Sequence, residues 1–368
     1  MKNTFGNTLT VTLFGESHGS CIGAVLDGVS PGVDVDEAYI IHELDRRRAK
    51  GATSTARHES DTPKIVSGVY GGKTTGTPIT VIIENADTHS GDYESTRFLA
   101  RPSHADYTAH VKYGGFEDYR GGGHFSARLT AAFVAAAGIV KCALEKKGIT
   151  VVTHAARCAG VSDRSFENLQ SDADYLRTIP TDRFPVLDEN AAERMRSKII
   201  EAKENLDSVG GILETAILGV GAGLGEPWFD SVESELSHIL FSIPAVKGVE
   251  FGLGFGFADK CASEANDPFY SDGNGGIFTR TNNNGGINGG ITNGMPILFR
   301  TAVKPTPSIA KEQDTVNIET GENAKLSIHG RHDPCVVMRA APVVDAAAAL
   351  VIADFLLMRE GEKALRVD

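Results

Sequence analysis

The chain has 368 residues, with 36 Lys and Arg against 48 Asp and Glu, a formal net charge of −12. This acidic balance argues against nucleic acid and anionic membranes as main partners, because both repel a negative surface. Five scattered cysteines without a C-x-x-C pair predict reduced thiols in a cytoplasmic protein. The chain opens without a signal-peptide pattern, and no apolar run looks long enough to span a bilayer.

Short strands and one helix are predicted at the start of the chain. The strands are expected over residues 8–14, 22–26, 64–69 and 78–83. Between them, Asp34 and Glu37 resemble a capping box that opens a helix as far as Arg48. Three arginines, residues 46–48, end this helix, where cations offset the negative end of the helix dipole.

The pattern farther along the chain is mainly helical. The clearest helix covers residues 126–147 and is rich in alanine, which permits close packing in the interior. Further helices are predicted over residues 190–206, 230–241 and 343–358, and a strand over residues 212–220. Because no Pro/Ser-rich linker divides the chain, we expect one large α+β domain over residues 1–368.

Three segments lack a regular pattern. Glycine and asparagine dominate residues 282–294, NNNGGINGGITNG. Strand-like flanks favour an ordered glycine loop at a site here, and a flexible surface loop is the alternative. Residues 87–99 and 264–279 are polar and are expected to form mobile surface loops.

Two near-matches to phosphate motifs fail on their context. SGVYGGKT (residues 67–74) resembles a P-loop, but Ser67 stands at the first glycine position and a strand follows. GVGAGLG (residues 219–225) lacks the third glycine of the dinucleotide motif, and Pro227 follows where a helix should run. Since the sequence also has no H-E-x-x-H or paired His/Cys cluster, it predicts no P-loop, Rossmann or metal site.

Four short segments place His or Arg among Gly, Ser, Asp and Pro. They are FGESHG (14–19), RPSHADYT (101–108), YRGGGHFSAR (119–128) and GRHDPC (330–335). Cations concentrated in glycine-rich turns of an acidic chain predict a specific site for a small anion. In the third segment the glycines lead into a helix, whose free N–H groups and Arg128 suit phosphate or carboxylate. A flexible loop with a solvated Arg128 is the alternative.

Two histidines and one aspartate in these segments are candidates for chemistry. His18 and His104 are each expected in a turn, the first between Ser17 and Gly19 and the second between Ser103 and Ala105. A single histidine of this kind is more often structural than catalytic. Asp333, between His332 and Pro334, is by itself typical of a turn.

Seven segments, taken together, are more specific. After the first three come SIPAVKGVEFG (242–252), NGGITNG (288–294) and KPTPSI (304–309), and GRHDPC closes the series. Each is weak alone, but seven in one order exceed coincidence. Over residues 4–354 the chain closely resembles the chorismate synthase family.

The resemblance implies a fold, a reaction and an assembly. The fold would be one α+β domain in which sheets sandwich long helices, assembled as a homotetramer. The reaction would be that of a lyase of the shikimate pathway, which converts 5-enolpyruvylshikimate 3-phosphate to chorismate and phosphate by 1,4-elimination. The family binds reduced FMN, although the reaction has no net redox change. Because no nicotinamide site is recognisable, we expect a separate flavin reductase.

Roles for single residues also follow from the family. His18 would donate a proton near the departing phosphate and His104 would hold or protonate the reduced flavin, although the two roles could be exchanged. Asp333, with Ser17, would relay the ring proton through the flavin N5. A phosphate and two carboxylates need several cations. The expected substrate contacts are Arg47, Arg101, Arg128, Arg331 and Lys50. The expected FMN contacts are His124, Phe125, Ser126, Pro244, Ala245, Gly289, Lys304, Pro305, Thr306, Pro307, Ser308 and Arg331.

The chain departs from the family pattern at two places. Many members have Arg-Ser where this chain has His124 and Phe125, and many carry an Arg after the helix-ending triplet where it offers only Lys50. Two other function classes stay open: a flavin or sugar-phosphate binding protein without catalysis, and an ordinary flavin oxidoreductase. The first could dispense with the candidate His and Asp residues, and a redox-neutral product balance would exclude the second.

Overall fold

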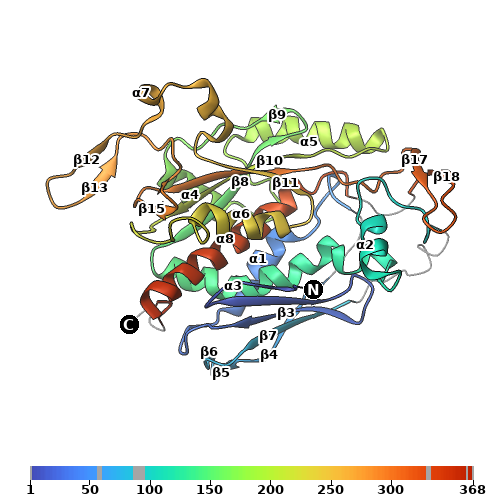
Figure 1. Cartoon of the computed structure of the whole chain (residues 1–368), viewed down its shortest axis with the longest axis horizontal. Helices are drawn as coiled ribbons and strands as arrows, with labels where there is room; N and C mark the ends of the chain where they lie inside the picture. The colour runs from blue at the N-terminus through green and yellow to red at the C-terminus, as the bar shows by residue number, and fades with distance from the viewer. Residues whose placement is uncertain (1, 56–59, 86–95, 329–332, 362–363, 367–368) are drawn as a thin grey trace.

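Two antiparallel sheets enclose a layer of long helices (Figure 1). The computed structural model describes residues 2–55, 60–85, 96–328, 333–361 and 364–366. The first sheet has the order β1-β2-β3-β7-β4, from Thr4–Phe5, Thr10–Gly15, Cys21–Asp27, Ile79–Glu84 and Pro63–Ser67. The second has the order β11-β16-β10-β8-β9, from Val246–Phe251, Ile297–Val303, Gly211–Leu218, Thr150–Cys158 and Val161–Ser162.

Three helices fill the space between the sheets: α1 (Glu37–Arg47), α3 (Thr130–Lys146) and α8 (Val337–Glu360). Helix α3 packs against β3 and β7 of the first sheet, and α8 packs against β8 and β10 of the second. Residues 131–144 of α3 are all buried. A helix that is apolar all round can be stable only if it is covered on every side, and the many alanines let neighbours approach closely. The expected α+β sandwich of sheets around long helices is confirmed.

Two of the described helices are long and apolar enough to cross a membrane, so the sequence-based expectation that no run was long enough is wrong. They are Ala127–Lys146 and Val337–Glu360. In each, 94% of the apolar window is buried inside the protein. Burial between two sheets accounts for their composition, because a core helix needs apolar residues on all faces.

Shorter elements cover the outside of the sandwich. Helices α4 (Leu169–Thr178) and α5 (Glu189–Glu204) lie over the second sheet, and α6 (Val232–Ser242) packs against α8 and β11. Helix α2 (Asp106–Tyr113) stands at the end of the sandwich, near the β17–β18 hairpin (Figure 1). The remaining short elements are β5 (Val69–Tyr70), β6 (Lys73–Thr74), η2 (Arg120–Phe125), η3 (Ala127–Leu129), η4 (Gly254–Asp259), α7 (Ala262–Ala265), β12 (Phe269–Ser271), β13 (Ile277–Thr279), β14 (Ile287–Asn288), β15 (Ile291–Thr292), β17 (Gln313–Val316) and β18 (Asn323–Leu326).

The elements predicted from the sequence are largely confirmed, with two corrected starts. Helix α1 is capped by Asp36, whose carboxylate accepts a hydrogen bond from the Tyr39 N–H at 3.0 Å. Asp34, the expected cap, instead pairs with Lys73. Helix α8 begins at Val337, before the predicted residue 343. Pro342 signals a helix boundary in a sequence, but here it lies inside the helix near its start.

Two of the three irregular segments are ordered, and the third lies mostly outside the described residues. Residues 264–279, expected to be a mobile loop, include the β12–β13 hairpin, which projects from the body (Figure 1). In residues 282–294 the Asp267 carboxylate accepts the N–H groups of Asn283 and Asn284 at 2.7 and 2.8 Å, and the β14–β15 hairpin follows. The ordered alternative for this glycine segment is therefore confirmed. Of residues 87–99, positions 87–95 fall outside the described residues.

Candidate active site

Three of the four segments meet around a run of glycines. Residues 121–123 have φ values of 59°, 86° and 52°, a region that favours glycine. A Cβ added to Gly121 would lie 2.5 Å from Cδ2 of His18 and 3.0 Å from the Ser17 Oγ. A Cβ added to Gly122 would lie 3.1 Å from Cε1 of His104. The glycines therefore let both imidazoles approach the backbone. We call this the glycine-turn cluster: Ser17, His18, Arg101, His104 and residues 121–123.

The FGESHG turn joins β2 to β3 and is fixed from two sides. The Asn85 amide donates hydrogen bonds to the carbonyls of Glu16 and Gly19 at 3.0 and 2.9 Å. The Ser17 N–H donates to the Gly123 carbonyl at 3.1 Å, which ties the turn to the glycine run. The Ser17 side chain is fully buried, and its hydroxyl has no hydrogen-bond partner among the described residues. A buried hydroxyl of this kind is expected to have a partner, so the turn is suited to a ligand.

Asp106 organises the RPSHADYT segment at the start of α2. Its carboxylate accepts from Nε and Nη2 of Arg101 at 2.7 and 2.6 Å and from Nδ1 of His104 at 2.7 Å. Burial would raise the pKa of Asp106, but these two hydrogen-bonded partners outweigh it and hold the pKa well below its usual range. The bond to Nδ1 leaves Nε2 of His104 on the side of Gly122. Sequence reasoning missed Asp106, although it lies only two residues after His104 in the same segment.

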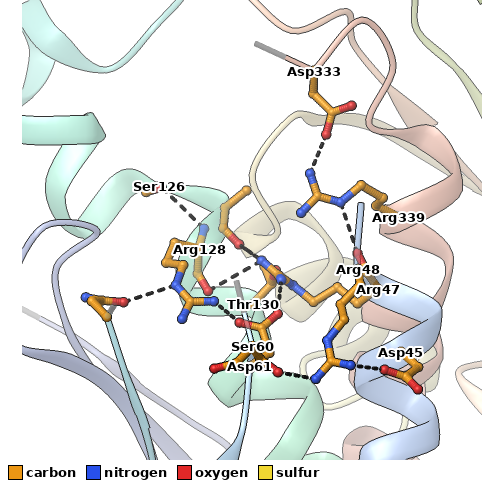
Figure 2. A network of polar contacts seen from close by, with 12 residues as sticks. Asp45, Arg47, Arg48, Ser60, Asp61, Ser126, Arg128, Thr130, Asp333 and Arg339 are labelled. Atoms are coloured by element: carbon orange, nitrogen blue, oxygen red, sulfur yellow. Dashed lines mark hydrogen bonds and ion pairs between the residues drawn. The ribbon is translucent and has the colours of Figure 1, made fainter. Parts of the chain in front are cut away.

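A second group, the guanidinium cluster, lies between α1, the start of α3 and the start of α8 (Figure 2). It comprises Arg47, Asp61, Arg128, Asp333 and Arg339. Asp61 bridges the two arginines expected at the substrate, because one carboxylate oxygen pairs with Arg47 at 3.2 Å and the other with Arg128. The three side chains are only 2–4% exposed. Asp61 therefore neutralises positive charge on the two arginines that the sequence analysis expected to contact the substrate.

The remaining N–H groups of these two arginines also have acceptors within the protein. Arg47 donates to the Thr130 hydroxyl and to the Ala127 carbonyl, both at 2.8 Å. Arg128 donates to the Asn85 side-chain oxygen at 3.1 Å. Because Asn85 also holds the FGESHG turn, it connects the guanidinium cluster to the glycine-turn cluster.

Asp333 lies at the edge of the guanidinium cluster, facing Arg339 (Figure 2). Nη1 of Arg339 donates to the Asp333 carboxylate, and Nε of Arg339 donates to the Arg47 carbonyl at 3.0 Å. Burial raises the pKa of Asp333, and Arg339 only partly offsets this rise. A carboxylate with a raised pKa is suited to accept a proton. Sequence reasoning missed Arg339, since nothing in the first turns of an apolar helix marks one arginine as a partner.

The KPTPSI segment joins the RPSHADYT segment. The Lys304 N–H donates to the Ala245 carbonyl at 2.9 Å, and Nζ of Lys304 donates to the Ser103 carbonyl. Ala245 has a φ of 74°, which is unusual for a residue with a side chain. Thr306 has a buried hydroxyl without a partner among the described residues. Gly289 does not join this group within one chain. Its neighbour Gly290 accepts the Val232 N–H at the start of α6, whereas Ala245 follows the end of that helix, and the helix is about 16 Å long.

Comparison with known proteins gives a consistent result. A family model described as chorismate synthase matches residues 9–357. The chorismate synthase of Thermococcus gammatolerans is 49% identical over 355 residues, covering 96% of this chain and 98% of the relative. That of Cytophaga hutchinsonii is 44% identical and covers all of both chains. A crystal structure of chorismate synthase aligns with a TM-score of 0.75 and 31% identity, covering 97% of this chain and 94% of the other.

The chain belongs to the chorismate synthase family. It is therefore an enzyme, a lyase of the shikimate pathway that forms chorismate. The resemblance inferred from seven short segments is confirmed, and the two alternative function classes lose their basis.

The residues at which the chain departs from the family pattern have partners of their own. Nδ1 of His124 donates to the Gly15 carbonyl at 2.9 Å, and Phe125 packs its ring against Tyr113. Ser126 caps η3 by accepting the Arg128 N–H at 3.2 Å. Nζ of Lys50 donates to the Thr181 hydroxyl at 2.5 Å. Arg331 lies outside the described residues.

Proposed function

We propose that the chain converts 5-enolpyruvylshikimate 3-phosphate to chorismate and phosphate beside the glycine-turn cluster, with reduced FMN as cofactor. One observation carries the proposal: the buried Ser17 hydroxyl lacks a partner at the point where two imidazoles lie against glycine backbone. Glycine at these positions lets both imidazoles and the Ser17 hydroxyl converge on one turn, where the unpaired hydroxyl can bind a polar or anionic group of a ligand.

The described residues fit a flavin. Ala245, Lys304 and Thr306 lie together through the Lys304–Ala245 hydrogen bond, and Thr306 offers a free buried hydroxyl. Lys304 joins this group to the RPSHADYT segment through Ser103. We assign these residues to FMN, with His124, Phe125 and Ser126 on the glycine run. When bound, reduced FMN supplies an electron-rich ring that assists loss of phosphate without net oxidation.

The two histidines move protons beside adjacent glycines, His18 at Gly121 and His104 at Gly122. His18, next to Ser17, donates a proton to the departing phosphate oxygens, which lowers the charge that develops there. His104 presents Nε2 to the cofactor, because Asp106 holds its Nδ1. Arg101 donates to the same carboxylate through two N–H groups and so fixes Asp106 in place behind His104.

Asp333 accepts the proton that leaves the substrate ring. Its raised pKa makes it a stronger base than an ordinary aspartate, and Arg339 fixes its orientation. We therefore expect turnover to fall on the acid side at a higher pH than an ordinary carboxyl would give. Arg47 and Arg128 remain substrate contacts in this proposal. This requires that some of their N–H groups leave the Asp61 carboxylate and donate to the substrate instead.

The deciding experiment supplies the substrate and chemically reduced FMN under anaerobic conditions and follows chorismate and the flavin spectrum together. We expect chorismate to form over many turnovers while the flavin stays reduced. Stoichiometric oxidation of the flavin would contradict the redox-neutral reaction, and turnover without flavin would contradict the cofactor.

The wider setting is also proposed. The family resemblance supports a homotetramer, a separate flavin reductase and a cytoplasmic location. Sedimentation of the purified chain tests the tetramer. Reduction of bound FMN by nicotinamide nucleotides, with and without an added reductase, tests the second point. Rapid reduction by the chain alone would contradict a separate reductase.

A further inference from the structure

Two buried cysteines from distant parts of the chain meet behind the Asp333 turn. Cys158 ends β8 and Cys335 follows Asp333 by two residues, and their sulfur atoms lie 3.5 Å apart. Both are free thiols, 0% and 2% exposed. The proposed reaction uses neither of them.

The backbone holds the two sulfurs together. Cys158 lies opposite Gly211 at the start of β10, and the Val209 N–H just before that strand donates to the Pro334 carbonyl at 2.9 Å. The same short stretch of chain therefore fixes both cysteines. Their proximity follows from the fold.

We propose that Cys158 and Cys335 form a reversible disulfide under mild peroxide stress and that this bond lowers turnover by displacing the Asp333 turn. The effect on turnover rests on the proposed role of Asp333, whereas formation of the bond does not.

Small oxidants reach the pair through a cavity. Cys335 lines this cavity together with Arg48, Lys50, Arg183 and Arg339. Cys335 loses a proton and attacks one peroxide oxygen, which gives a sulfenic acid and water. Cys158 then attacks that sulfur and expels its oxygen as a second water. Two thiols thus lose two protons and two electrons, and the peroxide is reduced to water.

Access decides the order, because Cys335 lines the cavity and Cys158 is not among its lining residues. The hydrogen bond with Cys335 lowers the pKa of the Cys158 thiol against the effect of burial. The hydrogen bond with Cys158 and burial raise the pKa of the Cys335 thiol. Because only the thiolate attacks peroxide, the first step is slow and the pair stays reduced until oxidant accumulates.

The disulfide is expected to shift the Asp333 turn, because the bond is shorter than the present distance between the two sulfur atoms. A disulfide holds its sulfurs about 2.05 Å apart, so atoms now at 3.5 Å must approach by roughly 1.5 Å. Cys335 is two residues from Asp333, whose carboxylate Arg339 fixes. A misplacement of about 1 Å at a reacting group can cost about a hundredfold in rate. We therefore expect the oxidised enzyme to turn over about tenfold to a hundredfold more slowly.

The test treats the full-length reduced protein with hydrogen peroxide, removes the peroxide with catalase, and divides the sample. One part is alkylated and mapped by mass spectrometry without reductant. We expect the Cys158 and Cys335 peptides to be joined with the loss of two hydrogen atoms. The other part is assayed anaerobically with pre-reduced FMN before and after dithiothreitol. We expect the lost turnover to return with the reductant.

Variants separate this bond from general damage. Cys335→Ser and Cys158→Ala should each resist inactivation by peroxide, and two positions are used so that one failure to fold does not end the test. Cys142→Ser removes another buried thiol and should behave as the parent. Two separate free peptides after inactivation would overturn the disulfide. A joined pair with parental turnover would overturn the effect on Asp333. If the protein made no chorismate, the joined Cys158 and Cys335 peptides would still be detected by mass spectrometry. Failure of the proposed function can therefore be told apart from failure of the disulfide proposal.

Discussion

The glycine-turn cluster and the guanidinium cluster contain the same kinds of residue but use their polar groups differently. Around the glycine run, imidazoles face backbone without side chains, and the buried Ser17 hydroxyl has no partner among the described residues. In the guanidinium cluster, Arg47 and Arg128 share the Asp61 carboxylate and donate their other N–H groups to protein acceptors. Asp106 pairs Arg101 and His104 in the same way, so the opening for a ligand in the first cluster is the Ser17 hydroxyl. In the second cluster the two arginines hold the framework, and one buried Asp333 oxygen likewise has no partner among the described residues.

The cost of burying an unpaired charge explains why the arginines of the second cluster have protein partners. A buried guanidinium without a partner would cost several kcal/mol, so a chain that keeps two such groups in its interior must supply a carboxylate. Asp61 supplies it for both. Asp333 is the exception within the second cluster, because burial raises its pKa although Arg339 lies beside it. It is the carboxylate of this group that is best suited to exchange a proton.

The largest effect should come from Asp333→Asn, because it removes the proposed base while nearly keeping the volume. A positioned general base contributes about 10²–10⁴-fold, so single-turnover chorismate formation should fall by that factor with pre-reduced flavin. Binding of reduced FMN and of substrate should persist.

Asp314→Asn is a matched control, since Asp314 is an exposed carboxylate that pairs with Lys325. Cys335→Ser should mostly affect stability. Nearly parental turnover in Asp333→Asn would make Asp333 a turn residue only.

The second prediction addresses the framework role of Asp61. Asp61→Asn leaves two nearly buried guanidinium groups without their shared carboxylate, and breaking a buried pair costs about 3–5 kcal/mol in the free energy of unfolding. Urea denaturation of the purified variant measures this loss. Asp34→Asn breaks exposed pairs with Lys73 and Lys146 and should change stability little. Equal stability of the two variants would show that Asp61 is dispensable for the framework.

The sequence was sufficient to predict the parts of the candidate site that lie within one short segment of the chain. Each of the four segments carries its own polar residues, three of them with glycine, and the alanine-rich helix that follows the glycine run was also recognised. It was insufficient for partners that come from elsewhere. Asp61 lies 14 residues after Arg47 and 67 residues before Arg128, and no local pattern marks it as their bridge.

Sequence analysis was also insufficient for some secondary-structure elements and for the pairing of charged side chains. Strand β8, Thr150–Cys158, was not predicted, because its buried run TVVTHAARC lacks clear alternation between apolar and polar residues. The arginine triplet was interpreted as a helix-dipole feature, yet Arg46 pairs with Glu43 and with Asp345 of α8 in the interior. A sequence counts charges, whereas only the packed structure shows which of them are already neutralised.

A third prediction tests whether the guanidinium cluster also touches the ligand. If Arg47 or Arg128 binds the substrate, replacement by Ala should weaken substrate binding by about tenfold to a hundredfold and flavin binding much less, because a charge-assisted contact contributes about 1.5–3 kcal/mol. Both variants should also unfold more readily, since Asp61 loses a partner. Anaerobic titrations on protein still folded at low temperature separate the two effects. Unchanged substrate affinity in both variants would leave these arginines as framework only.

The smallest effect concerns a third buried cluster, which none of the seven segments contains. His154 on β8 is fully buried between Asp163 and Glu214, with each ring nitrogen 2.9 Å from a carboxylate oxygen. Like the guanidinium cluster, it pairs a buried cation with acids, but its cation can lose its proton.

Burial would lower the pKa of His154, yet the hydrogen bonds to Asp163 and Glu214 outweigh it and raise the pKa above its usual value of 6.5. A raised pKa in the folded state means that the charged pair stabilises the fold fully below about pH 6.5 and that this contribution is lost as pH rises through the folded-state pKa. His154→Gln stays neutral, so the difference in unfolding free energy between parent and variant should be largest near about pH 6 and shrink toward about pH 9. Urea denaturation across that range measures it, with the exposed His238→Gln as control. A difference that stays constant with pH would mean that His154 contributes packing alone.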